Sequence, residues 1–155
     1  MKNTFNDRSE TKLGRAGETI VMNYFSLNGS IVEASVNQFD SQKDMLVDGT
    51  KKVEVKTQVP FIKKDAFTFR ENQLKKCIES DELYFVSVPN LKIKHYSAGK
   101  VYRADPKKMK YDFYRTKDGR QMVIIPIQQD AIIQLFVMSE HECELLRSYS
   151  VSKWN

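Results

Sequence analysis

The chain has 155 residues, of which 41% are hydrophobic and 29% are charged, so we expect a single folded domain over residues 1–155 and exclude a mainly disordered chain. The formal net charge of +5 favours a polyanionic partner but does not establish one. Because no apolar run has the length of a membrane span, the N-terminus is polar and the two cysteines lack CxxC spacing, we expect a cytoplasmic protein without a membrane segment, signal peptide, zinc site or disulfide framework.

Apolar residues recur at helical spacing in the N-terminal part of the chain, which predicts a helix from about Thr11 to Leu27. Asn28 and Gly29 supply the stop signal after it. Gly14 and Gly17 each cost this helix about 1 kcal/mol relative to alanine. Such a cost suggests that another backbone or a ligand approaches the helix closely.

Three strands are expected next. Ile31–Val36 forms the first, and Lys43–Val47 and Lys51–Gln58 form a hairpin. Asp48-Gly49 suits a hairpin turn that requires positive φ. Pro60 ends the third strand because proline cannot donate a hydrogen bond to a β-ladder.

The later part of the chain continues the alternation of helices and strands. The expected elements are a helix over Phe69–Ser80, a buried strand over Glu82–Val88, a second hairpin from Tyr111–Arg115 and Gln121–Ile127, and helical structure from about Gln129 that ends in a helix over Glu140–Tyr149. This order predicts an α/β domain with a central mixed β-sheet flanked by helices. The core would occupy about residues 11–90, and residues 91–155 would be a variable, basic and helical C-terminal part.

The third expected strand places polar side chains on one face. Side chains alternate along a strand, so Glu54, Lys56 and Gln58 point to the same side. Asp44 can approach Glu54 across the turn if the register is right. Two neighbouring carboxylates repel each other unless a cation lies between them, and such an oxygen-rich site suits Mg²⁺ or Mn²⁺ together with phosphate oxygens.

Asp44 followed by Glu54-Val55-Lys56 resembles the PD-(D/E)XK nuclease motif, although Lys43 stands where that family usually has proline. The segment GRAGE, which contains Glu18, is similar to the G-x-x-G-E segment that supplies a third acidic residue in Holliday-junction resolvases. The resemblance covers about Leu13 to Val88. It implies a restriction-endonuclease-like core.

The resemblance also implies a Mg²⁺-dependent endonuclease that hydrolyses DNA phosphodiesters, with Mn²⁺ as an alternative metal. Asp44 and Glu54 would bind the metal, Glu18 would bind it directly or through water, and Lys56 would orient the attacking water. Gln58 is a further catalytic candidate, because it resembles the E-x-K-x-Q extension of some branches. Cleavage of branched DNA by a homodimer, as in Holliday-junction resolvases, is the expected activity.

Other interpretations remain open. A homing or restriction-type endonuclease shares the same core, a non-catalytic nucleic-acid-binding module would keep the fold without cutting, and the chain can also be a structural oligomer. The polar strand face can be a solvated set of ion pairs, since alternating charge is common on exposed strands. Asp40 and Asp48 compete with Asp44, but the turn explains Asp48 better and Asp40 precedes the strand.

Ten basic residues lie between Lys92 and Arg120, with aromatic residues interleaved among them. This segment is either a solvated surface or a contact with the DNA backbone. The candidate DNA-binding residues are Arg15, Lys43, Lys92, Lys94, Arg103, Lys107 and Lys108.

Overall fold

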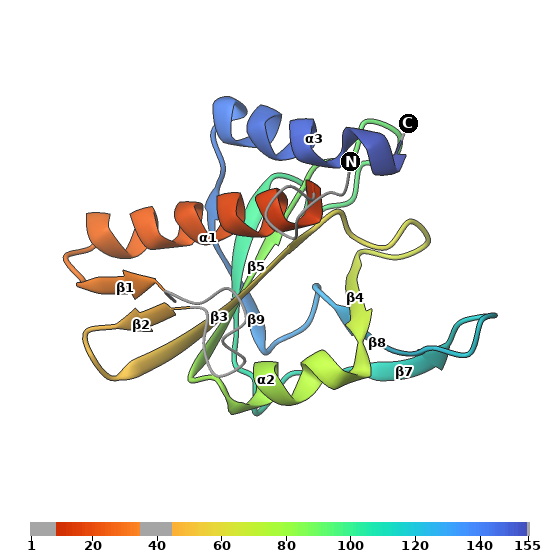
Figure 1. Cartoon of the computed structure of the whole chain (residues 1–155), viewed down its shortest axis with the longest axis horizontal. Helices are drawn as coiled ribbons and strands as arrows, with labels where there is room; N and C mark the ends of the chain where they lie inside the picture. The colour runs from red at the N-terminus through yellow and green to blue at the C-terminus, as the bar shows by residue number, and fades with distance from the viewer. Residues whose placement is uncertain (1–8, 35–44, 155) are drawn as a thin grey trace, which may run out of the picture.

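The computed structural model describes residues 9–34 and 45–154, and Figure 1 shows their arrangement. The elements are α1 (Ser9–Leu27), β1 (Val32–Ala34), β2 (Met45–Val47), β3 (Lys51–Gln58), β4 (Ala66–Arg70), the 3-10 helix η2 (Glu71–Gln73), α2 (Leu74–Glu79), β5 (Glu82–Ser87), β6 (Lys100–Ala104), β7 (Asp112–Arg115), β8 (Gln121–Pro126), β9 (Ile132–Val137) and α3 (Glu140–Trp154).

The strands form a main sheet and a small sheet. The main sheet has six strands in the order β1-β2-β3-β5-β6-β9, and the small sheet has three in the order β4-β8-β7. Strands β3 and β5 are parallel, and the other neighbouring strands are antiparallel. In Figure 1, α1 and α3 lie together on one side of the main sheet, and α2 lies on the other side with the small sheet. The fold is therefore mixed α/β, as expected.

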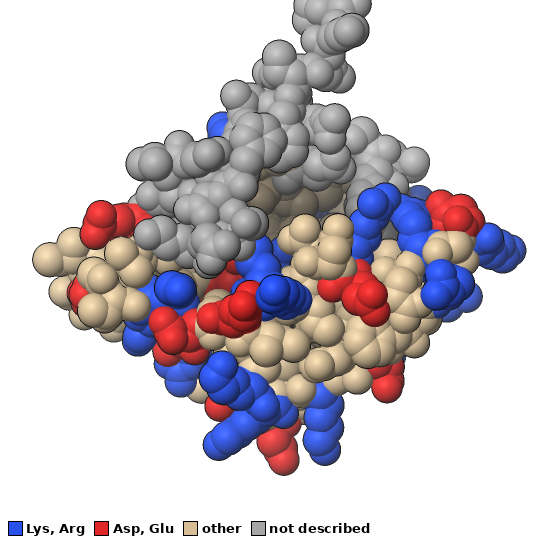
Figure 2. Space-filling view, turned by 60° about the horizontal axis from the view of Figure 1, so that its bottom comes forward, with Lys and Arg blue, Asp and Glu red and all other residues tan. Residues whose placement is uncertain are grey.

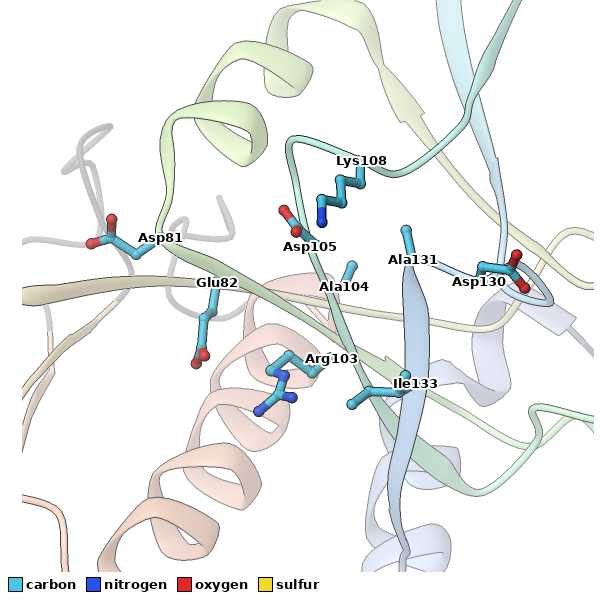
Figure 3. Close-up of a pocket in the computed structure, with 9 residues that line it drawn as sticks. All are labelled: Asp81, Glu82, Arg103, Ala104, Asp105, Lys108, Asp130, Ala131 and Ile133. Atoms are coloured by element: carbon cyan, nitrogen blue, oxygen red, sulfur yellow. The ribbon is translucent and has the colours of Figure 1, made fainter.

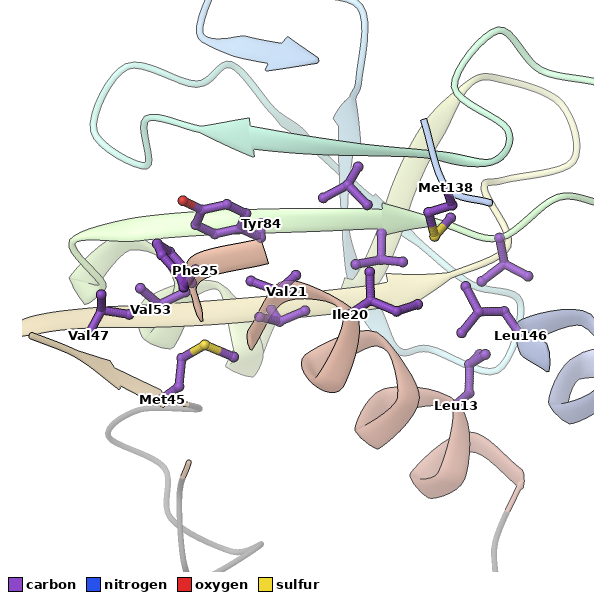
Figure 4. Packing of buried hydrophobic residues seen from close by; sticks show 14 of the residues in the cluster. Leu13, Ile20, Val21, Phe25, Met45, Val47, Val53, Tyr84, Met138 and Leu146 are labelled. Atoms are coloured by element: carbon purple, nitrogen blue, oxygen red, sulfur yellow. The ribbon is translucent and has the colours of Figure 1, made fainter. Parts of the chain in front are cut away.

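One hydrophobic core lies between the main sheet and helices α1 and α3. Ile20 and Val21 of α1 pack against Val53 of β3 and Tyr84 of β5, while Leu146 of α3 joins the same cluster. Figure 4 shows these side chains converging between the helices and the strands. The helical spacing of the apolar residues in α1 directs one stripe of the helix onto the sheet, so burial of that stripe holds the helix there.

A second core fills the opposite face of the main sheet. Phe67 of β4 meets Phe85 of β5 edge to face, with ring centroids 4.7 Å apart, and Leu74 and Cys77 of α2 pack into the same cluster. Tyr102 of β6 also belongs to it. Tyr102 here and Leu146 in the first core show that residues 91–155 contribute side chains to both hydrophobic cores.

The turn between β2 and β3 has the backbone that its sequence predicts. Asp48 has φ of 53° and Gly49 has φ of 76°, and both lie in the left-handed region. The Asp48 side chain also accepts a hydrogen bond from the backbone nitrogen of Ile31 at 2.9 Å. The stop after α1 is confirmed as well, since Gly29 has φ of 85° directly beyond the helix.

The expected helical structure is wrong for residues 129–137, whereas the expected helix over Glu140–Tyr149 is confirmed by α3. Ile132–Val137 is strand β9, and Ile133 lies opposite Arg103 of β6 at the edge of the main sheet. Periodicity alone cannot separate a short apolar strand from a short buried helix. The run IIQLFV is rich in β-branched and aromatic residues, which favour the strand.

The expected helix over Phe69–Ser80 is too long. Phe69 and Arg70 end strand β4, where they lie opposite Val123 and Met122 of β8. The helix α2 begins only at Leu74, after the single turn of η2. The boundary between β4 and the helix depends on pairing with β8, which lies more than 50 residues later in the chain. The spacing of neighbouring residues cannot predict such a distant partner.

The remaining expectations agree to different extents. Strand β5 and the β7–β8 hairpin match their expected positions to within one residue, whereas strands β4 and β6 were not expected. Residues 35 and 36 of the first expected strand lie outside the described residues. Neither Cys77 nor Cys143 forms a disulfide bond. Within residues 9–34 and 45–154, no helix is long and apolar enough to cross a membrane.

Candidate active site

Glu54 is a buried carboxylate in the middle of β3. Its relative exposure is only 1%, and it lies beside Leu83 of the parallel strand β5. Val53 and Val55 belong to the core on the α1 side, so alternation directs Glu54 toward the opposite face, where α2 packs. The predicted strand and the predicted polar face are both confirmed.

Two lysines form ion pairs with this carboxylate. Lys56, two residues along the same strand, places Nζ 3.4 Å from Oε2 of Glu54. Lys76 of α2 places Nζ 3.4 Å from Oε1. The side chains of the two lysines are only 16% and 20% exposed, so the charges meet in a largely dehydrated place. We call Glu54, Lys56, Gln73 and Lys76 the Glu54 cluster.

Lys56 has two further contacts that fix its position. Its Nζ donates a hydrogen bond to Oε1 of Gln73 at 3.0 Å and lies 5.3 Å from the ring centroid of Phe69. Gln73 precedes α2 directly, so the start of that helix sets the location of the amide. The Lys56 ammonium is therefore held by groups from three different elements.

A buried carboxylate that remains charged requires cations or hydrogen-bond donors close by, because dehydration of a lone charge is very unfavourable. The Glu54 cluster supplies two ammonium groups. Carboxylate oxygens are the ligands that Mg²⁺ and Mn²⁺ prefer, so Glu54 is chemically suited to hold one of these metals. The described residues of the cluster therefore supply one possible metal ligand, Glu54, whose charge the two ammonium groups already neutralise.

Gln58 is the third polar residue on this face of β3. Its Nε2 donates to the backbone oxygen of Thr68 at 3.0 Å, and its Oε1 accepts from the backbone nitrogen of Thr68 at 2.7 Å. The side chain thus forms both bonds of a β-ladder with strand β4. Its amide joins the main sheet to the small sheet here.

Glu18 and Arg15 lie on α1, where Glu18 is half-buried and Arg15 is exposed. The helix covers the face of β3 that carries Val53 and Val55, whereas Glu54 extends from the other face. Helix α1, which carries Glu18, thus lies on the opposite face of β3 from the Glu54 side chain. Asp44 and Lys43 lie outside the described residues. Among the residues that the structure describes, no group of three or more His, Cys, Asp and Glu side chains is placed to hold a metal ion.

The basic candidates are distributed over several surfaces. Lys92 and Lys94 are exposed in the loop that leads from β5 to β6, and Lys107 is exposed in the turn after β6. On the face shown in Figure 2, Lys and Arg side chains lie among Asp and Glu side chains rather than in one continuous patch.

Arg103 and Lys108 line a hollow of about 490 Å³ at the end of β6 (Figure 3). The same hollow is lined by four carboxylates, those of Asp81, Glu82, Asp105 and Asp130. In Figure 3, the Lys108 side chain extends toward Asp105. The excess of carboxylates makes this hollow a poor receptor for a phosphate group.

Lys76 and Gln73 are the site residues that sequence reasoning missed. Their spacing was the available signal, because residues three apart share one face of a helix. Leu74 and Cys77, which have the same spacing, are buried and fix how the helix is oriented on the core. Finding them also required the position of α2 over β3, which the local sequence does not contain.

No family model, curated protein or solved structure matches this chain. Proposals about its function therefore depend on the residues and contacts described above.

Proposed function

We propose that this protein is a Mg²⁺-dependent DNA endonuclease with a restriction-endonuclease-like core, acting on branched DNA as a homodimer. The observation that carries the proposal is the buried Glu54 beside Lys56 on one face of β3, at 3.4 Å. A carboxylate and a lysine two residues apart on one strand face supply a metal ligand and a cationic group that faces the same site.

Each residue has a definite role in this proposal. Glu54 and Asp44 would hold the metal, which would polarise the phosphodiester and lower the pKa of a bound water. Lys56 orients the attacking water and stabilises negative charge on the phosphate. Its contacts with Gln73 and Phe69 support that role, because an ammonium that is already fixed loses little freedom when substrate binds. Helix α1 covers the opposite face of β3, so this proposal gives Glu18 no contact with the metal.

The order of elements also supports the proposal. Helix α1, strands β1 to β3, helix α2 and strand β5 follow the order of helix, three strands, helix and strand that the sequence pattern predicts. Strand β4 is an addition between β3 and α2, where Gln58 fastens it to β3. In this proposal Gln58 keeps the end of β3 in place and does not contact the reacting atoms.

One observation favours a second candidate function. Glu54 has two lysine partners from the chain itself, and a carboxylate that is paired in this way can be purely structural. A non-catalytic nucleic-acid-binding module would have this arrangement. Exposed lysines such as Lys92 and Lys94 would then carry the binding.

The test is cleavage of a labelled four-way junction and of a matched linear duplex, with Mg²⁺ and with chelator. We expect symmetric, Mg²⁺-dependent nicks in the junction, which are lost in Lys56→Gln and retained in Lys75→Gln, a change of an exposed lysine on α2. Thermal unfolding of both variants checks that they fold. Cleavage of the linear duplex alone would indicate a homing or restriction-type enzyme. Binding without cleavage under every condition would favour the binding module.

A further inference from the structure

Two loops leave the main sheet side by side. Strands β3 and β5 are parallel, and their last residues, Gln58 and Ser87, lie opposite each other. Residues 59–65 continue from β3 to β4, and residues 88–99 continue from β5 to β6. The backbone nitrogen of Val88 donates to the backbone oxygen of Gln58 at 2.9 Å where the loops begin. We call these two segments the paired loops.

Hydrogen bonds fasten the paired loops to each other. Because a carbonyl oxygen can only accept, Nε2 of His95 donates to the backbone oxygen of Phe61 at 2.8 Å. The backbone nitrogen of Ser97 donates to Oδ2 of Asp65 at 3.0 Å, and the Ser97 hydroxyl donates to Oδ1. Ser97 is buried, with its hydroxyl oxygen 2.9 Å from that of Ser87 at the end of β5. The two loops therefore form one joined surface.

The paired loops expose lysines, whereas their one carboxylate is bonded within the fold. Besides the bonds from Ser97, Asp65 accepts a bond from Nε2 of Gln128 at 3.3 Å. Four lysines of the paired loops are exposed, namely Lys63, Lys64, Lys92 and Lys94. Four lysines and one aspartate give the loops a formal charge of +3 with His95 neutral. Within residues 9–34 and 45–154, none of these lysines forms an ion pair. The surface therefore favours a polyanion.

An exposed aromatic ring belongs to the same surface. Tyr96 directly precedes the buried Ser97 and is 67% exposed. Nζ of Lys100, at the start of β6, lies 3.5 Å from the centroid of the Tyr96 ring, and this cation–π contact holds the ring. Proteins that bind unpaired strands combine such groups, because bases stack on aromatic rings while basic side chains neutralise the phosphates.

We infer that the paired loops bind a nucleic acid strand with unpaired bases, with the four exposed lysines at its phosphates and Tyr96 stacked on a base. The inference rests on the nucleic acid ligand of the proposed function and names the surface that holds it. Branched DNA offers such a strand where a flap or a gap interrupts the pairing. Gln58 lies four residues beyond Glu54 on β3, about 13 Å at the rise of a strand, so the paired loops begin close to the Glu54 cluster.

The experiment measures binding of the whole chain to labelled single-stranded DNA and to a matched duplex by fluorescence anisotropy, with chelator present to prevent cleavage. Cosedimentation with vesicles that contain phosphatidylserine tests an anionic membrane. Two double variants each remove two lysine charges from one loop: Lys63→Gln with Lys64→Gln, and Lys92→Gln with Lys94→Gln. The matched control removes two exposed lysines outside the paired loops, Lys52→Gln with Lys75→Gln. Circular dichroism establishes that each variant is folded.

We expect each loop variant to bind the single strand at least about tenfold more weakly than the unaltered chain at about 0.1 M salt. The slope of log affinity against log salt should become shallower by about 1.4, because two phosphate contacts are lost. The control variant should retain the original affinity and slope. Tyr96→Ala should weaken binding about fivefold or more without changing the slope, and Tyr96→Phe should bind as the unaltered chain does.

Equal losses in the control variant, or stronger binding to the duplex or to the vesicles than to the single strand, would overturn the inference. Cleavage of the four-way junction is measured separately with Mg²⁺. If the loop variants bind and cleave as the unaltered chain does, the inference fails and the proposed endonuclease stands. If binding depends on the paired loops but no DNA is cleaved, the inference stands and the proposed endonuclease fails.

Discussion

Gly17 of α1 lies so close to Thr57 of β3 that a Cβ atom at position 17 would overlap the threonine side chain. The contact includes the Cβ and Cγ2 atoms of Thr57, which are part of a stiff, β-branched side chain. The sequence predicted a close approach from the cost of glycine in a helix, and the neighbour is a strand side chain. At Gly14, by contrast, a Cβ atom would meet no heavy atom from elsewhere in the described structure within 4 Å, so packing does not require glycine there.

Alanine at these two positions should have opposite effects. Gly17→Ala should lower the free energy of unfolding by about 1–3 kcal/mol, because overpacking exceeds the gain in helix propensity. Gly14→Ala should raise it by up to about 1 kcal/mol, since only the propensity changes. Urea unfolding followed by circular dichroism measures both. Equal effects of the two changes would contradict close packing of α1 on β3.

Removing the charge of Glu54 should destabilise the chain. Glu54→Gln leaves Lys56 and Lys76 beside a neutral amide in a largely buried place, and breaking such a pair costs about 3 kcal/mol. Glu79→Gln changes an exposed carboxylate of α2 and should stay within about 0.5 kcal/mol of the original stability. Chemical denaturation without metal gives both values. A stable Glu54→Gln protein would show that the two ion pairs contribute little.

The two hydrogen bonds between the Gln58 amide and the backbone of β4 should stabilise the folded chain. Gln58→Ala removes both hydrogen bonds to Thr68 and leaves two partly buried backbone groups without them, which should cost about 1–3 kcal/mol. Hydrogen exchange at the Thr68 amide should accelerate in the same variant. Gln134→Ala, an exposed change on β9, serves as the control. Unaltered exchange at Thr68 would rule out the described bonding.

The elements that local sequence predicted are those whose signals are local. The alternation around Glu54, the Asp48-Gly49 turn and the stripe along α1 all depend on spacing within a few residues, and the structure confirms them. Strand β9 was missed because a short apolar run fits both a helix and a strand.

The rest could not be predicted because it depends on partners far away in the chain. Phe69 belongs to β4 through pairing with β8, more than 50 residues later. Lys76 reaches Glu54 only because α2 is anchored over the main sheet, and Gln58 meets Thr68 only because β4 turns back beside β3. The sequence identified Glu54 and Lys56 as a pair, whereas the cations and amides around them come from the tertiary fold.

Stability should fall at alkaline pH because of Tyr84. Burial, followed by a hydrogen bond to Glu82 at 2.8 Å, raises the pKa of Tyr84 well above its ordinary value. The folded chain then keeps a proton that the unfolded chain releases near pH 10, so this contribution is complete below about pH 10 and is lost as pH rises further. Tyr84→Phe cannot ionise in either state, and its stability should decline less steeply between about pH 9 and 11. Urea unfolding across this range compares how the stability of each protein changes with pH. Tyr96→Phe, at an exposed tyrosine, should retain the original slope, and an equal slope in Tyr84→Phe would contradict the role assigned to Tyr84.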